Sequence, residues 1–149
     1  MEICDFSLCT GCSACFNACV KNAISMKPDK KGFIRPVIDY SMCVNCNLCK
    51  KVCPANCSVE KFSLKDIYAA VSKNDAERER SSSGGIFSLL ARSVLKSGGV
   101  VCGAVFDDNM KVVHTTIREQ NELWKLQGSK YVQSEIGEIY KNIKKYKWA

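Results

Sequence analysis

The chain has 149 residues, which suits one medium domain or two small ones and excludes a large multidomain enzyme. Its 46% hydrophobic and 25% charged content is ordinary for a globular protein with a buried core. The eleven cysteines would indicate a disulfide scaffold in a secreted protein, but no apolar signal segment follows Met1. We therefore expect reduced thiols in a cytoplasmic protein. The apolar runs are far shorter than the roughly 20 residues of a membrane-spanning helix, so no membrane span is expected.

Eight of the cysteines form two copies of the pattern C-x2-C-x2-C-x3-C, the second 34 residues after the first. The first copy is Cys9, Cys12, Cys15 and Cys19, and the second is Cys43, Cys46, Cys49 and Cys53. Pro54 follows the second copy, whereas Val20 stands at the equivalent place in the first. A 4Fe-4S cluster has four iron corners, each of which needs one thiolate, and two intervening residues let consecutive cysteines reach adjacent corners. The pattern predicts two 4Fe-4S clusters.

Each cluster is expected to take three thiolates from its own repeat and the fourth from the other repeat. The two predicted ligand sets are Cys9, Cys12 and Cys15 with Cys53, and Cys43, Cys46 and Cys49 with Cys19. A cluster held by four thiolates carries a charge of about −2, so two clusters reduce the formal charge of +7 to about +3. An acidic redox partner explains the remaining basic surface as well as DNA does, and we expect a redox partner and no nucleic acid.

Structural zinc is the alternative use of these thiols. Zinc sites pair two C-x2-C motifs, which would leave two of the eight spaced cysteines idle. The three cysteines outside the repeats, Cys4, Cys57 and Cys102, are expected to be small buried hydrophobic residues. Cys57 is the candidate exception, because it follows the second repeat closely.

The repeats are joined by a predicted hairpin over residues 24–39, with its turn at residues 29–32. Gly11 and Asn45 occupy equivalent places in the two repeats and suit positive φ angles that bring N–H groups toward cluster sulfurs. The cysteine density falls after Cys57, so we place a domain boundary near Phe62. The predicted fold class is α+β: a ferredoxin-like two-cluster domain at 1–61, followed by part of an α/β domain at 62–149.

The second domain begins with a predicted strand over Asp66–Lys73 and a polar loop over Asn74–Ser83 that contains Arg78 and Arg80. Ser81, Ser82 and Ser83 offer an N-cap to a helix whose apolar residues run from Ile86 to Leu95, and Gly98 with Gly99 ends that helix. Such a loop suits a phosphate, although the local pattern alone favours an ordinary capped helix.

Two strands follow, at residues 100–106 and 111–117, joined by a turn at residues 107–109. His114 lies on the second strand and is assigned no role. Residues 122–126 are expected to be helical. From Ser134 an apolar stripe of Ile136, Ile139, Tyr140 and Ile143 predicts a last helix, with lysines on its solvated face.

Four strings together resemble the beta-subunit family of coenzyme F-420 hydrogenases and dehydrogenases, which are iron–sulfur flavoproteins. They are the cysteine repeats, the segment Gly32-Phe33-Ile34-Arg35-Pro36-Val37-Ile38-Asp39, the helix start Ser81-Ser82-Ser83-Gly84-Gly85-Ile86-Phe87, and Gly128-Ser129-Lys130-Tyr131-Val132-Gln133-Ser134. The repeats by themselves indicate only a ferredoxin-type module. The last two strings narrow the resemblance to this family.

The resemblance implies a flavin, FAD or another, that exchanges a hydride while the clusters carry single electrons. It implies that Ser83, Gly84 and Gly85 lie near the flavin or deazaflavin. Because members of the family continue beyond the position of Ala149, the resemblance also implies that the catalytic region is truncated here. The expected function is electron transfer to or from a flavoprotein subunit or another redox protein. A complete small flavin-dependent reductase and a zinc-stabilised binding module are the alternatives.

Overall fold

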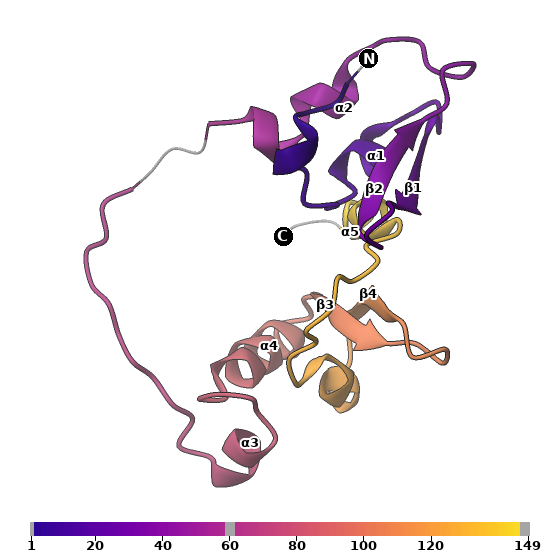
Figure 1. The fold of residues 1–149 in the computed structure, drawn as a ribbon. Coiled ribbons are helices and arrows are strands. Elements are labelled where there is room, and N and C mark those ends of the chain that lie inside the picture. Colours follow the sequence, from indigo (N-terminus) through magenta and orange to yellow (C-terminus); the bar gives the residue numbers. More distant parts are fainter. Residues whose placement is uncertain (1, 59–61, 147–149) are drawn as a thin grey trace. The chain divides into compact units, whose positions relative to one another are not determined.

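The computed structural model describes residues 2–58 and 62–146. Contacts divide the chain into two compact units, one formed by Met1–Phe62 with Ile136–Ala149 and the other by Ser63–Glu135. The α+β class is confirmed, because each unit combines short helices with a two-stranded antiparallel sheet (Figure 1). The predicted division into domains 1–61 and 62–149 stays a prediction, and the contacts differ from it in grouping the last helix with the first unit.

The two cysteine repeats of the first unit adopt the same local fold. Each gives a short helix, α1 at Ala14–Ala18 and α2 at Leu48–Lys51, and each helix follows a residue with a φ of 60°, Ser13 or Asn47. The 3-10 helix η1 covers Phe6–Leu8 before the first repeat, and η2 covers Pro54–Asn56 after the second. The sequence repeat is therefore also a structural repeat.

The predicted hairpin between the repeats is confirmed. Strand β1 (Ile24–Pro28) pairs antiparallel with β2 (Ile34–Ile38), and Ile24 lies opposite Ile38. Asp29 holds the turn, because its carboxylate accepts hydrogen bonds from the N–H groups of Lys31 and Phe33 at 2.8 and 3.0 Å. The core of the unit comprises Ile3, Cys15, Ile24, Cys49 and Cys53.

The last helix, α5 at Ile139–Ile143, packs against α1. The side-chain amide of Asn17 donates to the carbonyl of Gly137 at 2.8 Å, and its oxygen accepts from the N–H of Lys141 at 3.3 Å. The helix starts five residues later than predicted, after Gly137 with a φ of 54°. Lys147, predicted on its solvated face, lies outside the described residues.

The second unit is built on the predicted helix α4 (Ile86–Lys96) and the predicted hairpin of β3 (Val101–Phe106) and β4 (Val112–Ile117). The helix ends as predicted: Gly98 has a φ of 77°, its N–H donates to Leu95, and the N–H of Gly99 donates to Val94. The 3-10 helix η3 (Gln120–Leu126) replaces the predicted helical segment at 122–126. The core of this unit comprises Ala91, Leu95, Ile117, Leu123 and Leu126.

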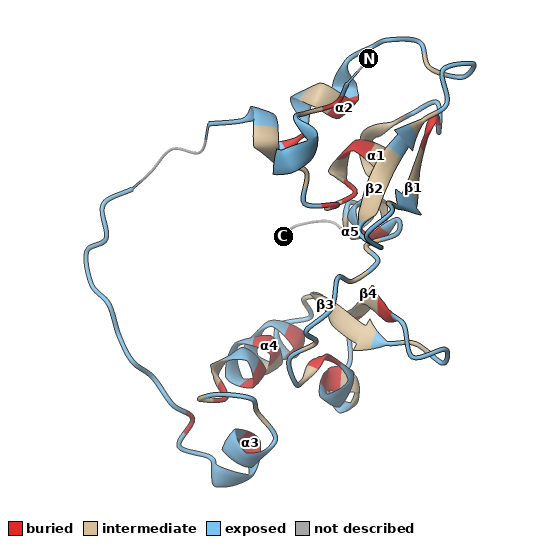
Figure 2. Cartoon of the chain, in the orientation of Figure 1, coloured by how far each residue is buried: buried red, intermediate tan, exposed pale blue. Residues whose placement is uncertain are grey.

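Three local predictions for the start of this unit are wrong. Residues 66–73 form no strand, because their apolar side chains, such as Ile67 at 83% exposure, find no neighbouring strand in the described chain (Figure 2). The polar loop contains helix α3 (Asp75–Glu79), capped by the Asn74 side chain. The N-cap of α4 is Gly85 with a φ of 79°, rather than one of the three serines.

Candidate metal centres

The first unit contains a hollow of about 240 Å³ that is lined by cysteines of both repeats. Cys9, Cys12 and Cys15 reach it from the first repeat, and Cys53 reaches it from the end of the second. These four residues are one of the two predicted ligand sets. Cys4, from the segment before the first repeat, lines the same hollow.

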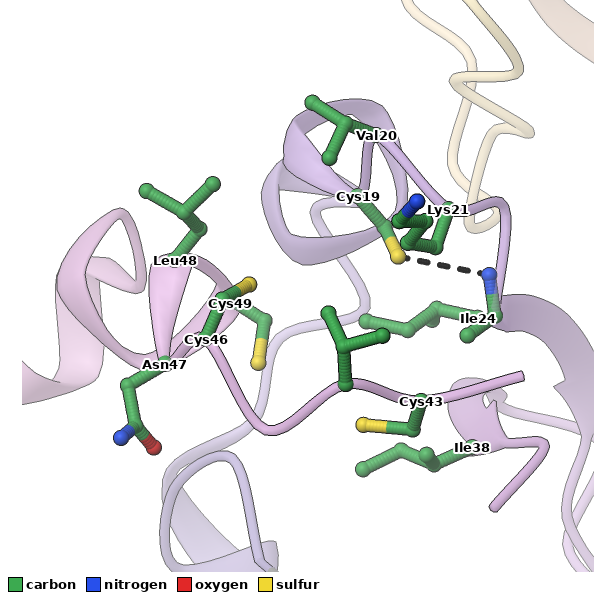
Figure 3. A pocket seen from close by; sticks show the side chains of 12 residues that line it. Cys19, Val20, Lys21, Ile24, Ile38, Cys43, Cys46, Asn47, Leu48 and Cys49 are labelled. Carbon is green, nitrogen blue, oxygen red and sulfur yellow. Dashed lines mark hydrogen bonds between the residues drawn. The ribbon is translucent and has the colours of Figure 1, made fainter. Parts of the chain in front are cut away.

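A second, tighter hollow of about 20 Å³ is lined by the other predicted set. Cys43, Cys46 and Cys49 come from the second repeat, and Cys19 comes from the end of the first. Figure 3 shows these four side chains converging from separate segments of the chain. Cys46 is exposed, as are the residues on either side of it, so the loop has room to open outward around a larger group.

Backbone N–H groups face the sulfurs in both hollows. Cys15 and Cys49 are equivalent in the two repeats, and the N–H groups of Phe16 and Lys50 partly offset the burial that raises the pKa of these two thiols. The N–H of Ala23 donates to the sulfur of Cys19 at 3.3 Å (Figure 3). Such hydrogen bonds stabilise negative charge on thiolates and raise the reduction potential of a cluster that the thiolates hold.

Left-handed backbone conformations let the chain turn around each hollow. Gly11 and Asn45 have φ angles of 70° and 54°, which confirms the prediction of positive φ at these two equivalent places. Ser13 and Asn47 share a φ of 60°, and sequence reasoning missed this second pair. The offset of 34 residues between the repeats could have indicated this pair, because it makes Ser13 and Asn47 equivalent.

Burial disfavours the charged form of several of these thiols. It raises the pKa of Cys15 to about 11 and that of Cys49 above the ordinary value. Burial, together with the nearby sulfurs of Cys53 and Cys9, raises the pKa of Cys4 to about 12. Positive charge inside the hollows would offset the free-energy cost of ionising these buried thiols, so the cysteines suit a bound group with a cationic core.

The spread of the sulfurs distinguishes between a cluster and a single ion. Among the described residues, no three Cys, His, Asp or Glu side chains lie close enough together to hold one metal ion. A zinc ion needs four ligand atoms, with its thiolates about 2.3 Å from the metal, whereas iron and sulfide atoms hold the thiolates of a cubane apart. Cysteines arranged around two hollows fit four-iron clusters better than zinc.

Arg35 on β2 places a positive charge beside Cys9, one of the residues that line the first hollow. Its guanidinium donates to the carbonyl of Cys9, stacks over the ring of Phe6 at 4.7 Å, and lies 3.5 Å from the carboxylate of Asp29. The sequence alone indicates no electrostatic role for Arg35, because this arginine lies in a hairpin more than twenty residues from Cys9.

The second unit has a hollow of its own, of about 310 Å³, between the start of α4 and the residues after η3. It is lined by residues 81–88 and 126–129, which include Ser83, Gly84 and Gly85. The Ser82 hydroxyl accepts a hydrogen bond from the N–H of Ser129 at 3.0 Å and joins the two segments. The two strings that carried the family resemblance therefore meet here. Arg78 and Arg80 do not line this hollow, which argues against their binding a phosphate there.

A buried ion pair supports the wall of this hollow. Glu77 is 8% exposed, and its carboxylate accepts hydrogen bonds from Arg92 at 3.1 Å and from the side chain of Gln127 at 3.0 Å. Gln127 also donates to the hydroxyl of Ser88 at 2.9 Å. Sequence reasoning missed this group, because nothing local distinguishes Glu77 from the other charged residues of α3.

The cysteines outside the repeats differ from one another. Cys4 packs against the core of the first unit and Cys102 is half-buried in β3, but Cys57 is exposed and its thiol donates to the carbonyl of Lys51. Cys57, the candidate exception, is thus the exposed one of the three. His114 lies 3.0 Å from the hydroxyl of Ser134 and lines none of the three hollows.

Residues 8–57, which contain both repeats and both sulfur-lined hollows, match the family model of the 4Fe-4S dicluster domain. This match defines an iron–sulfur protein that transfers electrons. Residues 67–141 match the model of the amino-terminal region of the coenzyme F-420 hydrogenase/dehydrogenase beta subunit. The chain belongs to this beta-subunit family, since the match spans half of it. No curated protein matches the chain.

Membership in a beta-subunit family indicates a subunit that works in a complex with other redox proteins. No helix within the described ranges has the length and apolar character needed to cross a bilayer.

Proposed function

We propose that the chain transfers single electrons through two 4Fe-4S clusters. The first is held by Cys9, Cys12, Cys15 and Cys53, and the second by Cys43, Cys46, Cys49 and Cys19. The observation that supports this assignment is that each hollow is lined by three cysteines of one repeat and the last cysteine of the other. When bound, the clusters would supply one-electron redox chemistry at low potential.

The chain's own residues set the conditions for this chemistry. Cys15, Cys49 and Cys53 are buried, which limits water around the sulfurs. The N–H groups of Phe16, Lys50 and Ala23 offset negative charge on the thiolates. Thiolates of this kind need a reducing compartment, and we propose the cytoplasm.

We propose a flavin site at the hollow of the second unit, with Ser83, Gly84 and Gly85 against the cofactor. Support comes from the position of these residues at the start of α4, whose free N–H groups favour an anion such as a flavin phosphate. A flavin would exchange electrons in pairs with its acceptor and singly with the clusters. Either this chain alone forms the flavin site, or a partner flavoprotein subunit completes it.

An uncovered apolar stripe on α4 supports the presence of such a partner. Phe87, Leu90 and Val94 lie on one face at helical spacing, and their exposed fractions are 46%, 64% and 43%. The adjoining face, with Ser88, Ala91 and Leu95, is buried in the unit. We propose that a redox protein or flavoprotein subunit covers the exposed face.

Anaerobic purification of the full chain tests the cluster proposal. We expect about eight iron and eight sulfide per chain, brown colour, and a paramagnetic signal after reduction with dithionite. The matched control is the double variant Cys12→Ser with Cys46→Ser, which removes one ligand from each proposed cluster and should lose most of the iron. About two zinc per chain without visible absorption would contradict the proposal.

Titration with FAD tests the flavin site separately. A Cβ at Gly84 would come within 2.5 Å of the carbonyl oxygen of Ala70, so Gly84→Ala must shift the wall of the hollow. We expect FAD affinity to fall about tenfold or more, a loss of about 1.4 kcal/mol. Gly98→Ala is the control, because Gly98 also sits in a turn but lies outside the hollow. Equal FAD affinity in wild type and Gly84→Ala would refute this placement.

A further inference from the structure

The first hollow holds one cysteine more than a four-iron cluster requires. Cys4 lines it together with Cys9, Cys12, Cys15 and Cys53. Burial raises the pKa of the Cys4 thiol, and the neighbouring thiols of Cys53 and Cys9 raise it further. It also packs against the buried group that contains Cys53. Two of the four proposed ligands therefore have a fifth thiol beside them.

The second hollow offers an internal comparison. The offset of 34 residues that relates the repeats makes Ile38 the equivalent of Cys4, and Ile38 lines the second hollow. Cys19 in the second hollow is likewise the equivalent of Cys53 in the first. No fifth cysteine lines the second hollow. An aliphatic side chain fills the equivalent place at Ile38, so packing alone does not require a thiol at Cys4.

We propose that Cys4 is a reserve ligand of the first cluster and binds the iron corner of Cys53 when that thiolate is lost. This inference rests on the proposed function, because it requires a cluster in the first hollow. On exchange, the bond between iron and the Cys53 sulfur breaks and a bond from iron to the Cys4 sulfur forms. The thiol proton of Cys4 passes, by way of solvent, to the released Cys53 thiolate, and no electron is transferred.

The test compares equivalent variants of the two hollows in the full chain, purified anaerobically. Cys53→Ala should keep about eight iron per chain, and Cys53→Ala with Cys4→Ser should keep about four. Cys19→Ala, the matched control, should also keep about four because Ile38 offers no ligand. Cys19→Ala with Ile38→Cys should recover iron toward eight. Wild type with eight iron establishes the clusters independently of these variants, so a failure of the reserve ligand is distinguishable from a failure of the proposed function.

Iron loss in Cys53→Ala equal to that in Cys19→Ala would overturn the proposal. Loss of the first cluster in Cys4→Ser alone would also overturn it, because Cys4 would then be needed for the ordinary site. If Cys53→Ala does not fold, Cys53→Val with and without Cys4→Ser provides the same comparison at the same iron corner. The paramagnetic spectrum of the reduced variant supplies a second readout, and a retained cluster with one changed ligand should show shifted g values.

Discussion

Double substitutions can establish whether the two repeats exchange their last cysteines. Cys19 and Cys46 line the same hollow, although they belong to different repeats. Cys12 lies in the repeat of Cys19 but lines the other hollow. If ligands are exchanged, Cys19→Ser with Cys46→Ser damages one cluster and leaves about four iron per chain. Cys19→Ser with Cys12→Ser damages both clusters and leaves almost none.

The exchanged arrangement also predicts how much each cluster stabilises the first unit. As a cross-link, the first cluster joins Cys15 to Cys53 and closes a loop of about 38 residues, worth about 4 kcal/mol by loop-closure entropy. The second joins Cys19 to Cys43 across about 24 residues, worth about 3.5 kcal/mol. A cluster held within one repeat would close a loop of about four residues between Cys15 and Cys19, worth about 2 kcal/mol.

Iron and sulfide analysis measures how many clusters each double variant keeps, and anaerobic thermal unfolding measures the stability lost with a cluster. Loss of one cross-link of this size should lower the unfolding midpoint by roughly 15 °C or more in a unit of this length. The reverse iron pattern would refute the exchange: about four iron left in Cys19→Ser with Cys12→Ser, and almost none in Cys19→Ser with Cys46→Ser. Each cluster would then be held by its own repeat.

Three other predictions concern charged side chains. Arg35→Gln removes a positive charge beside the first cluster and should lower its reduction potential, on the order of 40 mV, in an anaerobic redox titration; Lys30→Gln in the exposed turn is the control. Arg92→Leu leaves the buried carboxylate of Glu77 without its cation and should cost about 2 kcal/mol of stability, less than for a fully buried pair because the arginine side chain is 39% exposed. Chemical unfolding measures this loss, and a change below about 0.5 kcal/mol would contradict the role of the pair. Burial lowers the pKa of His114, so the unfolded chain binds a proton more readily than the folded one. Stability should therefore be full above about pH 6.5 and fall as the pH drops below it, and His114→Asn should reduce that slope in unfolding curves between pH 7 and 5.

The elements that the sequence predicts well are those fixed by local chemistry. The hairpin of β1 and β2 has alternating side chains and the turn residues Asp29 and Gly32, and it forms as expected. Helix α4 has both a repeating apolar face and the pair Gly98 and Gly99 at its end. The cysteine spacing likewise predicted which cysteines group together, because the chemistry of a four-iron cluster restricts how four thiolates can be arranged, and each predicted group lines one hollow. That these groups are cluster ligands stays a prediction.

The remaining features depend on contacts between distant residues. Alternation at Ile67, Ala69 and Val71 predicted a strand, but alternation cannot supply the neighbouring strand that hydrogen bonding requires. The chain is instead held there by a hydrogen bond of 2.6 Å from the N–H of Ser72 to the carbonyl of Gly84. The burial of Glu77 depends on a residue fifty positions later, and no local pattern reveals it.

The hydrogen bonds of Asn17 have a consequence for synthesis of the chain. This side chain joins α1 to Gly137 and Lys141, which are more than 100 residues further along. After a ribosome has made both cysteine repeats, it must still add about 90 residues before α5 is complete and can cover α1, which takes roughly 4 to 18 seconds. All eight proposed ligands are thus synthesised before their unit can close, and a chain cut after Phe62 would keep them while leaving one side of α1 uncovered.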